Sequence, residues 1–313
     1  MNGAAVNHAY GSAPSGIMEA PHVTLPDAKV FSKRATRLRE LVVQVPSLDE
    51  FLAFMARLVQ AQHQVLNDHE PAWRPAAGAF DQALKHGMPP LGFQALRRDV
   101  GWQHDLLALL DAVELHVGTR QRPLLDTLRE MPAEQLDALA DDVFEMRPGN
   151  EATRALLPLV AAALQVSWVR MAMGLPDVPT RPTGEAKTLC PCCGAAPVAS
   201  VVHNERHRSG VRYLHCAICA TEWHLERITC SACDTGGKLL YLSLDDEQGK
   251  PFLPVQAEAC GECHSYLKLM QRELHGRAEP IADDLASLAL DLLLAEQGEY
   301  VRSGYNPLLI TAD

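Results

Sequence analysis

Cysteine is absent from the first 189 residues of this 313-residue chain, and two other residue classes are scarce throughout it. Aromatic residues make up only 5% of the chain, so the core must be built mainly from aliphatic side chains. Basic residues are outnumbered, with 28 Lys and Arg against 39 Asp and Glu, which gives a formal net charge of −11. Proteins that act mainly on nucleic acids usually carry a basic footprint. We therefore expect no nucleic-acid partner.

Long apolar runs are also missing. The longest uncharged stretch that is mainly apolar, Ala155–Val169, contains Pro158 and is shorter than the roughly 20 residues that a membrane span needs. We interpret it as a buried helix and expect no membrane insertion. The first twenty residues hold no Lys or Arg and no apolar run of about seven residues, both of which a secretory signal requires. The expected location is the cytoplasm.

The cysteine-free half contains no phosphate-binding loop, no G-x-S-x-G elbow, no H-E-x-x-H motif and no dinucleotide fingerprint. Helical periodicity dominates it instead, starting from a capping box in which Ser47 caps the helix and Glu50 follows three residues later. Further helices are predicted over 93–117, 123–130, 133–144 and 151–173. A basic cluster near its start is either a solvated helix face or a docking site for an acidic partner; its members are Lys33, Arg34, Arg37 and Arg39.

All nine cysteines lie between Cys190 and Cys263, and eight of them form four C-x2-C pairs. Two such pairs place four thiolates around one centre, as in tetrahedral metal sites. Disulfides are the alternative, but they are rare in the reducing compartment expected here. The sequence therefore predicts two metal ions, iron or zinc, with these ligands: Cys190, Cys193, Cys216, Cys219, Cys230, Cys233, Cys260 and Cys263.

Consecutive pairing assigns the first four of these cysteines to one site and the last four to the other. Interleaved pairing, in which the second and fourth C-x2-C pairs share a metal, is the alternative. The ninth cysteine, Cys192, lies between two ligands and is either a passive thiol or an alternative ligand. Short strands are predicted around 197–202, 211–215, 223–228, 238–244 and 255–257. They indicate a zinc-ribbon or rubredoxin-like arrangement.

One more helix is predicted near the end of the chain, starting at Asp283 and Asp284, whose charges suit a helix N-terminus. Proline and glycine between residues 176 and 184 mark a linker between the two halves. We therefore predict an α+β protein in three parts. Residues 1–28 form a flexible segment, 29–182 a helical domain, and 183–313 a tandem four-cysteine metal domain with a C-terminal helix.

The second half resembles a known family. The matching strings are Leu189-Cys-Pro-Cys-Cys-Gly-Ala-Ala-Pro197, Arg212-Tyr-Leu-His-Cys216, Thr221-Glu-Trp-His224, Cys230-Ser-Ala-Cys233, Cys260-Gly-Glu-Cys263 and Ala282-Asp-Asp-Leu-Ala-Ser-Leu288. In order and spacing they resemble FdhE, the formate dehydrogenase accessory proteins, over nearly all of residues 189–308.

The resemblance implies a cytoplasmic protein that formate dehydrogenase needs for activity and that binds its catalytic subunit before export. It also implies metal bound in a rubredoxin-like setting by the four C-x2-C pairs. Rubredoxin-type knuckles favour glycine after the second cysteine, and here only Gly194 fits, with Ala220, Asp234 and His264 at the other three positions. Iron and zinc therefore both remain open.

No catalytic constellation is visible, so we expect an assembly chaperone rather than an enzyme. Its partner contacts are predicted to include Tyr213, Trp223 and Tyr266, because these residues flank the cysteine pairs. The alternative is a redox protein or a thiol- or sulfur-handling protein that acts on the same enzyme.

Overall fold

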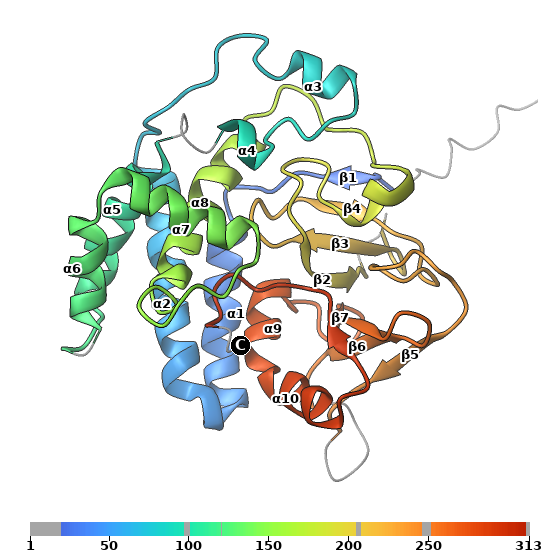
Figure 1. Cartoon of the computed structure of the whole chain (residues 1–313). Helices are drawn as coiled ribbons and strands as arrows, with labels where there is room; N and C mark the ends of the chain where they lie inside the picture. The colour runs from blue at the N-terminus through green and yellow to red at the C-terminus, as the bar shows by residue number, and fades with distance from the viewer. Residues whose placement is uncertain (1–19, 97–100, 120, 205–207, 246–251, 311–313) are drawn as a thin grey trace, which may run out of the picture.

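The structure, a computed structural model, describes residues 20–96, 101–119, 121–204, 208–245 and 252–310. Helices of the N-terminal half pack side by side, and the sheet of the C-terminal half lies against them (Figure 1). The predicted α+β class is confirmed, with a helical region followed by a sheet region that carries both cysteine groups.

The helical region is organised around α8 (Leu157–Met173), in which every residue from Leu157 to Val169 is buried. It packs against α2 (Asp49–Asp68), α5 (Trp102–Glu114) and α7 (Ala133–Phe144). The other elements are α1 (Val30–Gln44), α3 (Asp81–Lys85), α4 (Phe93–Leu96), α6 (Arg122–Glu130) and the 3-10 turns η1 (Pro46–Leu48) and η2 (Gly184–Thr188). The uncharged stretch is thus a buried helix, as predicted. Across the described ranges, every helix is too short or too polar to cross a bilayer.

Two helix starts differ from the prediction. Ser47 does not cap α2, because residues 46–48 form the η1 turn and Leu48 takes the N-cap position without a side-chain hydrogen bond. The stretch predicted as one helix over 93–117 contains α4 and α5, and Gly101 caps α5 with a left-handed φ of 62°. A β-carbon at Gly101 would lie 2.8 Å from Ala72 Cβ, so this turn requires glycine.

The strands form one sheet in the order β1-β4-β3-β2-β7-β6-β5. Antiparallel β2 (Pro197–Val202), β3 (Arg212–Cys216) and β4 (Glu222–His224) form one unit, and antiparallel β5 (Leu239–Leu242), β6 (Val255–Cys260) and β7 (Ser265–Gln271) form the other. The two units join through parallel pairing of β2 with β7, and β8 (Val301–Arg302) pairs with the start of β7. Both cysteine units therefore belong to a single sheet.

The N-terminal segment adds a strand to this sheet. β1 (Val23–Thr24) pairs with β4, His22 O accepts a hydrogen bond from His224 N at 2.8 Å, and Pro21 O accepts one from the Tyr213 hydroxyl at 2.7 Å. The prediction of a flexible segment over residues 1–28 is therefore corrected for residues 21–24, because their backbone groups find partners at the sheet edge. Residues 1–19 lie outside the described residues.

The C-terminal helix is interrupted. α9 (Pro280–Ala286) and α10 (Leu288–Gln297) meet at Ser287, whose hydroxyl donates to Asp283 O at 2.8 Å. Lys268 Nζ, fully buried on β7, donates to Asp284 O and Ser287 O. α9 lies between α1 and strands β2 and β7 (Figure 1), so it packs the two regions together.

Charged side chains are buried at this junction. Arg37 of α1 donates hydrogen bonds to both carboxylate oxygens of Asp283 on α9, and Arg34 Nε donates to Glu279 at 2.9 Å. The exposed fraction of each of these four side chains is 8% or less. The basic cluster thus docks, through Arg34 and Arg37, onto an acidic helix of its own chain. Glu279 rather than the Asp pair provides the N-cap of α9, because it accepts from Ala282 N.

Candidate metal centres

Each C-x2-C pair forms a tight turn with the same backbone geometry. The residue after the second cysteine has a left-handed φ in all four turns: 80° at Gly194, 57° at Ala220, 63° at Asp234 and 55° at His264. The three non-glycine residues therefore adopt the conformation that the knuckle requires, at a cost in backbone strain. The glycine departure noted in the sequence does not alter the turn.

Backbone amides point at the first sulfur of each turn. The N–H two residues after each first cysteine lies 3.4 Å from its Sγ: Cys192 to Cys190, Ile218 to Cys216, Ala232 to Cys230 and Glu262 to Cys260. Such N–H donors favour the thiolate, which is the form that binds metal.

A hydroxyl group supports the second sulfur in three of the four turns. Thr221 Oγ1 lies 3.1 Å from Cys219 Sγ, Thr235 Oγ1 lies 2.9 Å from Cys233 Sγ, and Ser265 Oγ lies 2.9 Å from Cys263 Sγ. The hydroxyl residue stands two positions after the second cysteine each time. This repeated C-x2-C-x-[Thr/Ser] pattern is visible in the sequence, but our sequence reasoning missed it.

The sulfur atoms converge in two groups, and the grouping is that of consecutive pairing. Within each group, all four sulfur atoms lie within 4.8 Å of one another; the groups are Cys190, Cys193, Cys216 and Cys219, and Cys230, Cys233, Cys260 and Cys263. Sulfur–sulfur distances across the turns are 3.5 and 3.4 Å in the first group and 3.7 and 3.8 Å in the second. A disulfide would require about 2.05 Å.

These separations fit a metal ion. Four sulfurs at about 2.3 Å from a tetrahedral zinc stand roughly 3.8 Å apart, and a four-thiolate iron site is of similar size. The donor set is soft and complete, since four thiolates leave no position for water or substrate. Both groups can therefore hold a closed metal site.

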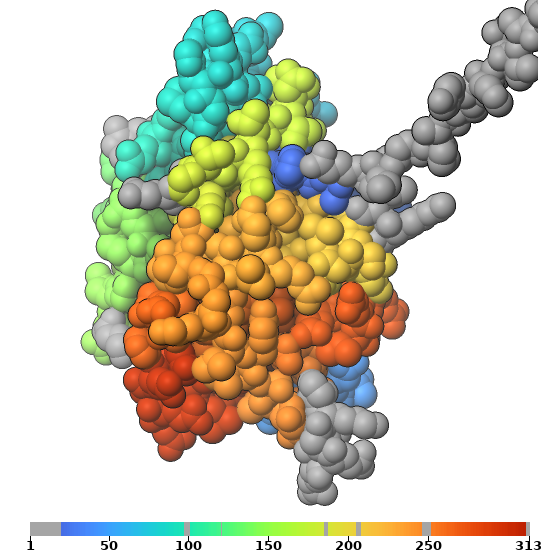
Figure 2. All heavy atoms as spheres, turned by 90° about the vertical axis from the view of Figure 1, so that its right-hand side faces the viewer, coloured from blue at the N-terminus to red at the C-terminus, as the bar shows by residue number. Residues whose placement is uncertain are grey.

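Exposure to solvent distinguishes the two groups. All four cysteines of the first group are buried, whereas Cys263 is exposed and Cys233 half-buried in the second. The orange segment that carries the second group lies across the middle of the face shown in Figure 2. The second group is thus the one that solvent and a partner can reach.

The pKa values of these cysteine thiols are shifted in opposite directions, some above and some below the ordinary value. Burial raises the pKa of Cys190 and Cys193 well above its usual value, and raises that of Cys230 to about 12. Burial also acts to raise the pKa of Cys260, but backbone N–H donors from Cys263 and Glu262 outweigh it and bring the value to about 6. The Thr235 hydroxyl lowers the pKa of Cys233.

Cys192 stays outside both groups of converging sulfurs. It is fully buried, and its carbonyl accepts a hydrogen bond from Leu91 N at 2.8 Å. A hydrogen bond to Cys219 raises the pKa of its thiol well above the usual value. Cys192 thus anchors the first knuckle to the helical region.

The three aromatic residues predicted as partner contacts lie inside the protein. Tyr213 donates to Pro21 O, Trp223 Nε1 to Lys187 O at 2.9 Å, and the Tyr266 hydroxyl to Asp291 at 2.8 Å. All three are buried, with at most 3% of the residue exposed. Their prediction as contacts is corrected, because rings next to the knuckles fill the core rather than face solvent.

Comparison with known proteins gives a consistent family match along the chain. Three family models match in turn. The model described as "FdhE, N-terminal" matches residues 20–185, "FdhE, central domain" matches residues 189–227, and "FdhE, C-terminal domain" matches residues 228–309. Protein FdhE of Shigella boydii serotype 18 is 37% identical over 294 residues, which cover 94% of this chain and 92% of that protein. Protein FdhE of Escherichia coli O157:H7 is 36% identical over the same length and coverage.

A solved structure matches as well. The crystal structure of the FdhE protein from Pseudomonas aeruginosa superimposes with a TM-score of 0.83 at 36% sequence identity. The match covers 92% of this chain and 99% of that one.

Proposed function

Because this chain belongs to the FdhE family, we propose that it is an accessory protein that formate dehydrogenase needs for its assembly and activation. It binds the catalytic subunit of that enzyme in the cytoplasm, before export. The observation that carries the proposal is the match to all three family segments by a chain whose eight cysteines converge in two four-sulfur groups.

Two metal ions, iron or zinc, are held by these cysteines and keep the sheet region folded. A structural four-thiolate site contributes its binding free energy to folding, on the order of 10 kcal/mol for zinc peptides. Because such sites are closed, the protein acts through recognition of its partner rather than through catalysis at the metal.

The assay measures formate-dependent dye reduction per molecule of catalytic subunit, in cells with and without this gene. We expect activity per subunit to fall without the gene while the subunit is still made. Cys190→Ser and Cys230→Ser should each fail to restore it and should lose metal. Cys192→Ser is the matched control, because Cys192 lies in the same turn outside the converging sulfurs, and it should restore activity. Unchanged activity per subunit without the gene rejects the proposal.

One observation supports a second function, a rubredoxin-like redox protein or a thiol- or sulfur-handling protein that acts on the same enzyme. Cys263 is exposed and carries a hydroxyl partner, so the second group offers a sulfur that another protein can reach. A reversible one-electron wave of the iron-loaded protein, or loss of activation on Cys192→Ser alone, favours this function over simple binding of the partner.

A further inference from the structure

A groove runs along α2 in the helical region. α2 packs against both α1 and α5 (Figure 1), and residues of all three helices line the groove. The lining residues of α2 run from Ala53 to Gln64, a length of about 16 Å at 1.5 Å per residue. The volume of the groove is about 330 Å³. Among the described residues, its lining includes none of the cysteines, so it is separate from both candidate metal centres.

The floor of the groove is apolar and shallow. It consists of half-buried Val42 and four alanines, whose side chains end at the β-carbon and let another helix come close. Apolar surface continues at Val43 and Leu115, which are 79% and 88% exposed. These two residues adjoin the lining residues Val42 and His116 in the chain. The four alanines are Ala53, Ala56, Ala61 and Ala112.

Exposed cations stand around this floor. Arg39 comes from α1 and Arg57 from α2, and His116 follows α5. Within the described ranges no Asp or Glu lines the groove, although acidic residues outnumber basic ones by 39 to 28 in the whole chain. Arg39 Nη2 donates to Gln60 Oε1 at 2.8 Å, which is a neutral acceptor. Arg57 has no hydrogen-bond or ion-pair partner among the residues that the structure describes. Both guanidinium charges are therefore uncompensated in the groove.

The carboxylates that flank the lining residues of α1 and α5 are engaged with other cations. Glu40 pairs with Arg37 at 3.1 Å, and Asp111 and Glu114 both pair with Arg129 at 2.8 Å. On α2, acidic residues stand only at the two ends of the helix. The positive charge of the groove thus faces solvent rather than an acidic group of the same chain.

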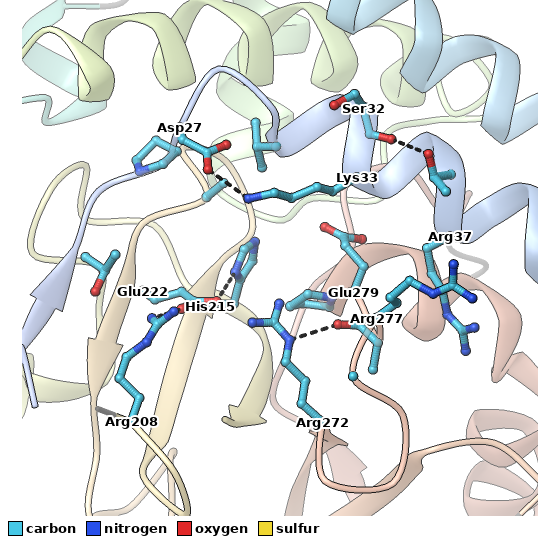
Figure 3. A pocket seen from close by; sticks show the side chains of 18 of the residues that line it. Asp27, Ser32, Lys33, Arg37, Arg208, His215, Glu222, Arg272, Arg277 and Glu279 are labelled. Carbon is cyan, nitrogen blue, oxygen red and sulfur yellow. Dashed lines mark hydrogen bonds and ion pairs between the residues drawn. The ribbon is translucent and has the colours of Figure 1, made fainter. Parts of the chain in front are cut away.

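Cations on the other side of α1 are paired within the protein. In the cavity of Figure 3, which lies between α1 and strands β3 and β4, Lys33 reaches Asp27 at 2.8 Å. Arg208 in the same cavity reaches Glu222 at 3.0 Å. The groove along α2 differs, because its two arginines keep their charge for a partner.

We propose that this groove docks an acidic amphipathic helix of the formate dehydrogenase catalytic subunit, an inference that rests on the proposed function. An amphipathic helix can lay its apolar face into a groove, and about three helical turns match the length from Ala53 to Gln64. Carboxylates on that helix pair with Arg39 and Arg57, since a guanidinium binds a carboxylate through two parallel hydrogen bonds. Opposite charges around an interface also select the partner and speed its association.

The test measures the affinity of the full, metal-loaded chain for the purified catalytic subunit by biolayer interferometry. Arg39→Gln/Arg57→Gln should weaken binding about tenfold, the effect of losing two exposed ion pairs. Arg39→Glu/Arg57→Glu should weaken it further, because like charges then face each other. Ala53→Phe, which fills the groove without a change in charge, should also weaken binding. Arg74→Gln is the matched control and should leave affinity unchanged, since Arg74 is a 72% exposed arginine of the helical region outside the groove.

Urea unfolding first shows that each variant is folded, and the arginine variants change only exposed positions. If the wild-type chain does not bind the catalytic subunit, the proposed function fails and this inference fails with it. If the wild-type chain binds and both double variants bind equally well, the assignment of the groove alone is overturned. Equal losses in the glutamine and glutamate variants would show an uncharged contact and overturn the acidic partner. Wild-type dimers that the glutamate variant dissociates would place a second copy in the groove and overturn it as well.

Discussion

The ion pair between Arg37 of α1 and Asp283 of α9 connects the helical region to the sheet region, and we predict that breaking it is strongly destabilising. Arg37 Nη2 lies 2.6 Å from Asp283 Oδ1, and Arg37 Nε lies 2.9 Å from Oδ2. The exposed fractions of the two side chains are 1% and 0%. The perturbation is Asp283→Asn, which keeps the shape and removes the charge.

Removal of one partner from a buried pair costs about 3–5 kcal/mol, because the remaining charge is left uncompensated. Arg37 retains Glu40 at 3.1 Å, with 20% of that side chain exposed. We therefore expect the lower end of the range, a loss of about 3 kcal/mol in the free energy of unfolding. In the double variant Arg37→Met/Asp283→Leu, no unpaired charge remains at this position. Its loss in free energy of unfolding should therefore be clearly smaller than the sum of the losses in Arg37→Met and in Asp283→Leu.

The assay is urea unfolding of the metal-loaded protein followed by tryptophan fluorescence. Trp102 and Trp168 report on the helical region and Trp223 on the sheet region, and all three are buried. Lys238→Gln, which removes an exposed ion pair, is the control and should cause no measurable change. A loss below about 1 kcal/mol for Asp283→Asn, or a double variant whose loss is additive, would refute the reasoning.

Two further predictions concern the cysteine turns. A chelator should remove metal in two phases, and the faster phase should come from the group that contains the exposed Cys263. A chelator dye whose absorbance changes on metal binding measures both phases. A single phase would contradict the difference in exposure between the two groups. Ala220→Gly should raise the free energy of unfolding by up to about 1 kcal/mol, since the left-handed φ strains alanine, whereas Ala217→Gly in the same turn should lower it, and urea unfolding compares them.

The cysteine groups were predictable because their geometry is local. A C-x2-C turn directs two sulfurs at one point whatever surrounds it, so four such turns indicate two sites without reference to any tertiary contact. The same locality explains why strands around residues 197–202 and 211–215 were found, since alternating short segments between knuckles have few other conformations.

Burial could not be predicted in the same way. The sequence left Arg34 and Arg37 open between a solvated face and a docking site, and it predicted Tyr213 as a partner contact. A charged or aromatic side chain follows the same helical or strand period inside and outside a core. Only the position of α9 against α1 decides that these arginines are buried, and only the strand from residues 23–24 decides that the Tyr213 hydroxyl meets Pro21.

The sequence by itself determined the division into a helical and a cysteine-rich part and the four C-x2-C turns, because periodicity and spacing act over a few residues, whereas the grouping of these turns into two sets came from the structure. The tertiary structure alone decided the parallel seam between β2 and β7, the burial of Lys268 under α9, and the meeting of Thr24, Lys33 and His215 in one cavity. These contacts join residues far apart in the chain, and such pairings depend on how whole elements pack rather than on any local pattern.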